Sequence, residues 1–118
     1  MKKYIYPLII MFLFITGCNS QSSSGTGTFV NKSTKSISTM TVTICHQVFT
    51  KSDLKPGDSF KINFKINFDS DYDINIEFSD GKKLNKKEGY VTNGMSTEDV
   101  IEIYDSDVRL VSNKISVD

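Results

Sequence analysis

The chain has 118 residues, of which 38% are hydrophobic and 24% charged, and 14 basic residues balance 14 acidic ones. This length suits one small domain, and it is enough for a single core without stabilising cross-links. The balanced charge supplies no basic surface of the kind that binds nucleic acid, so that class of function is excluded.

The N-terminus combines two lysines with an apolar run. Lys2 and Lys3 precede a hydrophobic stretch from Tyr4 to Ile15, interrupted only by Pro7. A helix that spans a bilayer needs about 20 apolar residues, whereas a secretory signal needs far fewer. The pattern therefore predicts an export signal rather than a retained transmembrane helix.

The next four residues carry a specific motif. Ile15, Thr16, Gly17 and Cys18 give an aliphatic residue, a small residue, a glycine and a cysteine. This pattern resembles the lipobox of bacterial lipoproteins. The resemblance implies cleavage between Gly17 and Cys18, a diacylglyceryl group on the Cys18 thiol and acylation of the new amino group. An ordinary secretory signal followed by a structural cysteine is the alternative.

Acyl chains on Cys18 would anchor the protein to a lipid bilayer without a transmembrane helix, because each buried methylene contributes about 0.8 kcal/mol. Asn19 stands where an Asp would imply retention in the inner membrane, so the resemblance favours the outer membrane of a Gram-negative cell, on its periplasmic or surface face. In a cell with one membrane, it implies the outer face of the cytoplasmic membrane. With Cys18 acylated, Cys45 has no partner for an internal disulfide.

These features divide the chain into three parts. Residues 1–17 are the predicted signal peptide, and residues 29–118 are the predicted β domain. Between them, residues 18–28 hold the lipidated cysteine and a Ser/Gly-rich segment, which we expect to be a flexible tether.

The first half of the domain is predicted as strands and turns. Phe29 and Val30 open a short strand, and residues 31–36 have the composition of a turn. From Ile37 to Thr50 the side chains alternate between β-branched and apolar positions, which predicts one strand. Pro56 and Gly57 then mark a turn.

The strongest pattern lies between residues 60 and 78. Every second residue from Phe60 to Phe68 and from Tyr72 to Phe78 is apolar, with polar residues between them. Two strands, each with one buried face, explain this alternation. We expect them to pair as a hairpin through the turn at 69–71, with lysines of the first strand opposite acidic residues of the second.

The C-terminal part continues in short elements. Asp80 and Gly81 predict a hairpin turn, followed by a lysine-rich edge strand over 82–87 and a further strand over 88–92. Residues 96–99 predict one helical turn, and strands follow at 100–104 and 108–111. About seven short strands indicate an all-β fold, a small antiparallel β-sandwich that is immunoglobulin-like in general form.

Candidate chemistry is sparse. Cys45 and His46 are adjacent, but neighbours in a strand point to opposite faces and cannot form a catalytic dyad. Residues 69–73 have the alternate acids of a calcium loop, yet Ile74 replaces the required glycine, so a solvated turn is the favoured interpretation. No metal cluster, catalytic triad or phosphate-binding loop is recognisable. We therefore predict neither enzymatic activity nor a cofactor or metal.

The hypothesis that remains is binding. Tyr90 and Asn93 lie in a loop-flanked segment suited to recognition. A basic cluster, which could touch anionic headgroups or simply protect an edge strand, consists of Lys82, Lys83, Lys86 and Lys87. The predicted function is binding of an envelope or secreted protein, in an inhibitory, immunity, exclusion or assembly role. The alternative is a small-molecule or glycan-binding module that uses the loops at 79–81 and 93–97.

Overall fold

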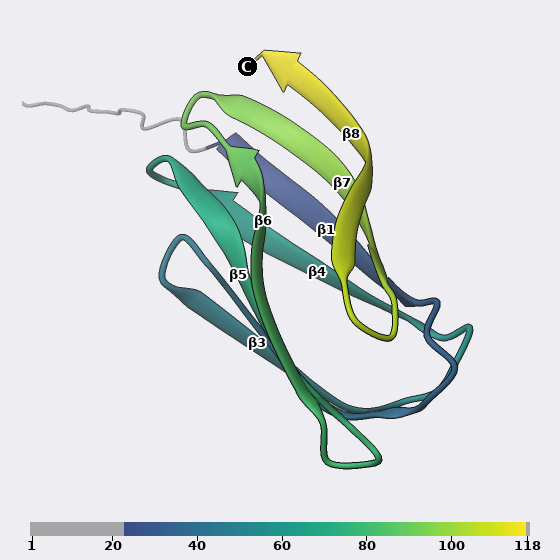
Figure 1. The fold of residues 1–118 in the computed structure, drawn as a ribbon. Helices are drawn as coiled ribbons and strands as arrows, with labels where there is room; N and C mark the ends of the chain where they lie inside the picture. Colours follow the sequence, from purple (N-terminus) through teal and green to yellow (C-terminus); the bar gives the residue numbers. More distant parts are fainter. Residues whose placement is uncertain (1–22, 118) are drawn as a thin grey trace, which may run out of the picture.

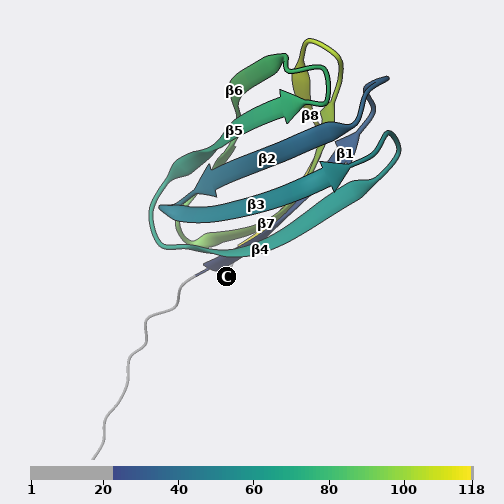
Figure 2. The same ribbon diagram turned by 90° about the horizontal axis from the view of Figure 1, so that it is seen from below.

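The computed structural model describes residues 23–117, which fold into two four-stranded sheets packed face to face (Figures 1 and 2). The strands are β1 (Ser23–Asn31), β2 (Ile37–Ile44), β3 (Gln47–Leu54), β4 (Ser59–Ile66), β5 (Ser70–Phe78), β6 (Lys83–Val91), β7 (Met95–Ile103) and β8 (Val108–Val117). The first sheet has the order β4-β1-β7-β8 and the second β3-β2-β5-β6. All neighbours are antiparallel except β1 and β7.

The predicted all-β sandwich is confirmed, with eight strands rather than seven. Within the described residues, no helix is long and apolar enough to cross a membrane.

The prediction of a flexible tether up to residue 28 is wrong from Ser23 onward. Ser23 to Thr28 belong to β1, which lies in the middle of its sheet between β4 and β7. Gly25 and Gly27 face the core, and the space that their missing side chains leave is filled by the rings of Phe64 and Tyr72. The glycines that suggested a linker therefore serve packing. Residues 1–22, including the predicted signal peptide and Cys18, lie outside the described residues.

The predicted hairpin between the two alternating segments is also wrong. β4 and β5 lie in different sheets, so the connection after Ile66 crosses from one layer to the other. Their apolar faces meet across the core, where the rings of Phe64 and Tyr72 pack edge to face with centroids 5.6 Å apart. Phe29 adds a second edge-to-face contact with Tyr72 at 5.7 Å. Burial of both apolar faces against each other explains the arrangement.

The predicted strand over 37–50 is two strands joined by a tight turn. Ile44 pairs with Gln47, and the two residues between them have positive φ angles, 49° for Cys45 and 61° for His46. Such hairpin turns usually contain Asn or Gly, so composition carried no turn signal here. The Gln47 side chain holds the turn in place, because its amide donates to the Lys65 carbonyl at 2.8 Å and accepts from the Lys65 N–H at 3.1 Å.

The predicted helical turn at 96–99 is wrong as well, since these residues lie within β7. Thr97 and Asp99 point into the protein and are 6% and 2% exposed, so they alternate with outward neighbours as strand residues do. The lysine-rich β6 is one of the two edge strands of its sheet, as predicted, but it is a single strand where two were expected over 82–87 and 88–92.

Candidate functional site

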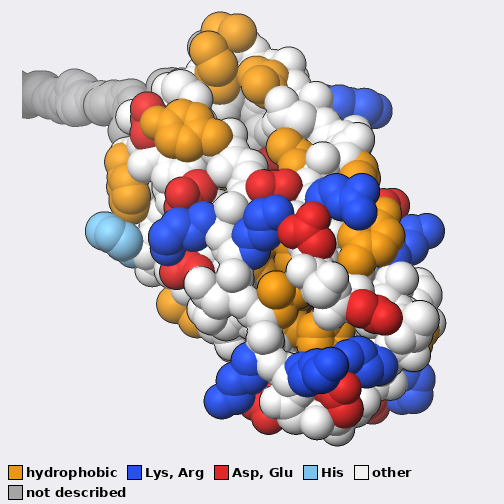
Figure 3. All heavy atoms as spheres, in the orientation of Figure 1, with side chains coloured by type: hydrophobic (Ala, Val, Ile, Leu, Met, Phe, Trp, Pro, Cys, Tyr) orange, Lys and Arg blue, Asp and Glu red, His pale blue; other side chains and the backbone are white. Residues whose placement is uncertain are grey.

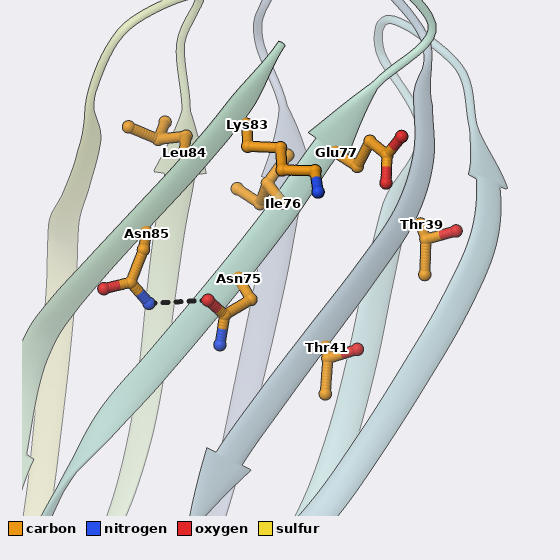
Figure 4. Close-up of a pocket in the computed structure, with 8 residues that line it drawn as sticks. All are labelled: Thr39, Thr41, Asn75, Ile76, Glu77, Lys83, Leu84 and Asn85. Atoms are coloured by element: carbon orange, nitrogen blue, oxygen red, sulfur yellow. Dashed lines mark hydrogen bonds between the residues drawn. The ribbon is translucent and has the colours of Figure 1, made fainter. Parts of the chain in front are cut away.

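A groove of about 470 Å³ lies on the outer face of the second sheet, over β2, β5 and β6 (Figure 4). It is lined by polar side chains from all three strands and by parts of two apolar ones: Thr39, Thr41, Asn75, Ile76, Glu77, Lys83, Leu84 and Asn85. Its volume falls in the range of small-ligand sites, about 300–1,000 Å³. The groove is therefore the candidate functional site.

Strand register builds the groove as two rows of side chains. In one row, Glu77 lies between Thr39 and Lys83 on the neighbouring strands. In the next row, Asn75 lies between Thr41 and Asn85. Directly opposite side chains on a sheet face lie about 4.5–5.5 Å apart. The rows therefore present hydroxyl, carboxylate, ammonium and amide groups at a fixed spacing.

Hydrogen bonds fix the two amide side chains of the groove and leave four other polar side chains free. The Asn85 amide donates to Asn75 Oδ1 at 2.7 Å and to Asp73 Oδ1 at 3.0 Å, so the amide row is rigid (Figure 4). Among residues 23–117, no hydrogen bond or ion pair engages the side chains of Thr39, Thr41, Glu77 or Lys83. These groups are free to donate to and accept from a polar ligand.

The predicted binding residues do not form one surface. Lys83 lines the groove, and Lys82 lies in the adjacent turn between β5 and β6. Lys87 points outward beside the groove and forms an ion pair with Asp73 at 3.2 Å. Tyr90 and Asn93 lie at the opposite end of β6, where the Tyr90 hydroxyl and the Asn93 N–H both donate to the Asp69 carboxylate. The Asp69 hydrogen bond raises the pKa of Tyr90.

Lys86 has a structural contact. Its ammonium donates to Asp107 Oδ1 at 2.7 Å and thus joins β6 to the turn between β7 and β8. This hydrogen bond raises the pKa of Lys86 and, with the Val108 N–H, lowers the pKa of Asp107. Alternation predicted that Asn75 and Glu77 face outward, and it placed Thr39 and Thr41 together on one face of their strand. Their grouping with β6 depends on the sheet order, which sequence reasoning missed.

The other candidate chemistry is placed away from the groove. Cys45 is buried with its thiol toward the Phe68 carbonyl at 3.4 Å, whereas the exposed His46 ring packs on the Phe68 ring at 4.6 Å. In the suspected calcium loop, Tyr72 points into the core. Across residues 23–117, no group of three or more His, Cys, Asp or Glu side chains could hold a metal ion.

A buried polar cluster lies between the two sheets. The Tyr72 hydroxyl donates to Asp99 Oδ2 at 2.6 Å, and the Thr97 hydroxyl donates to Asp99 Oδ1 at 3.0 Å. The amide of Asn113, an exposed residue of β8, donates to the same Oδ1. Burial, together with the hydrogen bond to Asp99, raises the pKa of Tyr72 far above its ordinary value of 10. The hydrogen bonds of this cluster join β5, β7 and β8 across the two sheets.

The raised pKa of Tyr72 predicts a loss of stability in alkali. Above pH 10 the unfolded chain releases the Tyr72 proton while the folded chain keeps it, so the free energy of unfolding falls as pH rises, by up to about 1.4 kcal/mol per pH unit. Urea unfolding of the wild type and Tyr72→Phe between pH 8 and 11 checks this. The two curves should converge as pH rises past 10, and parallel curves would contradict the assignment.

No known protein family matches the chain, and a search of curated proteins finds no match. Solved structures resemble its fold. A protein from Eubacterium rectale, known from NMR, is 17% identical with a TM-score of 0.55, over 80% of this chain and 93% of that one. A Bacteroides ovatus protein, named as a candidate for cell adhesion, is 6% identical with a TM-score of 0.51, over 81% of this chain. This chain spans 45% of the Bacteroides protein's length. At these identities the likeness concerns the fold alone.

Proposed function

We propose that the protein is a lipoprotein anchored to the cell envelope through Cys18, and that its β domain binds a partner protein there without catalysing a reaction. The observation that carries the binding role is the groove with its free polar groups on the outer face of β2, β5 and β6. The lipobox resemblance at residues 15–18 supports the anchor.

The shape of the site favours a protein over a small molecule. Ligand pockets usually enclose most of the ligand, whereas this groove is open and spreads over three strands. Specific protein interfaces cover about 800 Å² on each partner, an area that an outer sheet face can offer. The rigid amide row and the free hydroxyls beside it suit the peptide groups and polar side chains of such a partner.

A capture experiment with two matched variants tests the proposal. The tagged mature chain is the bait for envelope and secreted fractions, beside Thr41→Arg and Thr28→Arg. Both threonines are half-buried on the outer face of a central strand, but only Thr41 lines the groove. The wild type and Thr28→Arg should each retain one protein at near-equal stoichiometry. Thr41→Arg should retain at least tenfold less of that protein.

The volume of the groove and its hydroxyl, amide and charged groups favour a second function, the binding of a glycan or small polar molecule. A glycan array probed with the same three proteins distinguishes the two. The second function would be supported if the wild type binds a saccharide, Thr41→Arg does not bind it, and the capture experiment retains no protein. If Thr41→Arg changes neither result, the groove is not the binding site.

A further inference from the structure

Exposed apolar side chains gather at one end of the sandwich. This apolar end consists of the β2–β3 turn, the β4–β5 connection, the β6–β7 turn and the last residues of β8. These segments lie together with the start of β1. Ser23 pairs with Ile66, Met95 pairs with Val117, and the Gly94 N–H donates to Ser23 Oγ at 3.0 Å. Six of the seven exposed large hydrophobic residues of the described chain lie here, namely Val48, Phe68, Tyr90, Met95, Ile115 and Val117.

The exposure at this end is large. Val117 is 78% exposed, Tyr90 62% and Ile115 55%. Figure 3 shows hydrophobic side chains along the upper and left margins of the molecule, whereas charged side chains crowd its lower end. At that opposite end, Lys35 and Asp80 form an ion pair at 3.0 Å. One end of the sandwich therefore exposes apolar side chains, whereas the opposite end exposes charged side chains that suit contact with water.

The start of β1 fixes the distance between the apolar end and the predicted anchor. Five residue steps separate Cys18 from Ser23, and at 3.3–3.6 Å per residue they span at most about 18 Å. A strand of nine residues, such as β1, is about 30 Å long. With Cys18 in a bilayer, the apolar end thus stays close to the headgroups, and the opposite end reaches farther away.

We propose that the apolar end docks on the lipid bilayer, with Tyr90, Ile115 and Val117 entering the boundary between headgroups and acyl chains. This inference rests on the lipid anchor of the proposed function. Tyrosine is favoured at that boundary, and apolar side chains of surface-bound proteins enter it by about 5–10 Å. Acidic Asp69 and basic Lys114 both lie at this end, so apolar contact rather than net charge drives the docking.

Fluorescence quenching tests the docking separately from the anchor. The chain has no tryptophan, so Ile115→Trp reports on the apolar end, and Ser106→Trp, in the β7–β8 turn, reports on the opposite end as the control. The acylated proteins are purified and reconstituted into phosphatidylcholine vesicles with or without bromine on the upper acyl chains. Flotation of the vesicles measures anchoring, and bromine quenching measures contact with the acyl region.

We expect both proteins to float, with at least twofold quenching of Ile115→Trp and none of Ser106→Trp. Tyr90→Trp provides a second label and should also be quenched. Flotation without quenching of either label would overturn the docking. The apolar end would then be a contact surface for another protein or for a second copy of this chain. Failure to float would overturn the anchor instead. Coupling Cys18 to a maleimide lipid would then test the docking alone, and an unquenched label in that form would overturn it.

Discussion

Asp99→Ala is expected to lower the free energy of unfolding by about 3 kcal/mol, because it leaves buried hydrogen-bond donors without an acceptor. Tyr72 is 0% exposed, so water cannot replace the lost carboxylate. Thr97, which is 6% exposed, loses the same acceptor, whereas the amide of exposed Asn113 can bond to water instead. Urea unfolding monitored by circular dichroism measures the change.

Glu98→Ala is the matched control for this variant. Glu98 precedes Asp99 on β7 but points outward and is exposed, so its loss should change stability by less than about 0.5 kcal/mol. Combining Asp99→Ala with Tyr72→Phe should cost less than the sum of the single variants, because the two groups satisfy each other. Equal effects of Asp99→Ala and Glu98→Ala would contradict the burial of a connected cluster.

Gly25→Ala is expected to cost about 2–3 kcal/mol, although the substitution adds only one methyl group. The added Cβ would lie 2.3 Å from Cζ and 2.6 Å from Cε2 of the Phe64 ring. That ring is 3% exposed and packs on Tyr72, so it cannot move aside without disturbing the core. Thermal or urea unfolding measures the loss.

A second background shows whether the clash is the cause. In Phe64→Leu, the smaller side chain should leave room for the methyl group, and the further cost of Gly25→Ala should fall below about 1 kcal/mol. Ser24→Ala, on the outward face of the same strand, should be nearly neutral. If Gly25 belonged to a flexible tether, Gly25→Ala would be silent, so this variant decides between the two descriptions of residues 23–28.

Alternation predicted the faces of strands well but not their partners. The polar and apolar positions from Phe60 to Ile66 lie as expected, because a strand with one buried face leaves no other choice. Phe68, expected on the buried face, lies beyond the end of β4 and is 37% exposed. The same pattern is satisfied whether two strands pair side by side or face each other across a core. The hairpin expected between β4 and β5 was therefore a topological error, even though each strand was placed correctly.

Two local features escaped prediction for a related reason. Glycines in β1 and non-glycine residues at the positive φ angles of Cys45 and His46 contradict local propensity. Each is stabilised by residues distant in the sequence, the first by the ring of Phe64 and the second by the hydrogen bonds of Gln47 with Lys65. The candidate groove has the same character, because its two rows exist only once β2 and β6 flank β5.

The central position of β1 has a consequence for the order of folding. Its parallel partner is β7, and the pair Gly25 and Thr97 is separated by most of the chain. The first sheet therefore cannot form completely until the C-terminal third of the protein has been synthesised, although β1 is synthesised early. Pairings this distant make folding slow, on a scale of milliseconds to seconds. In the export that we propose for this protein, the chain would therefore stay incompletely folded until most of it has crossed the membrane.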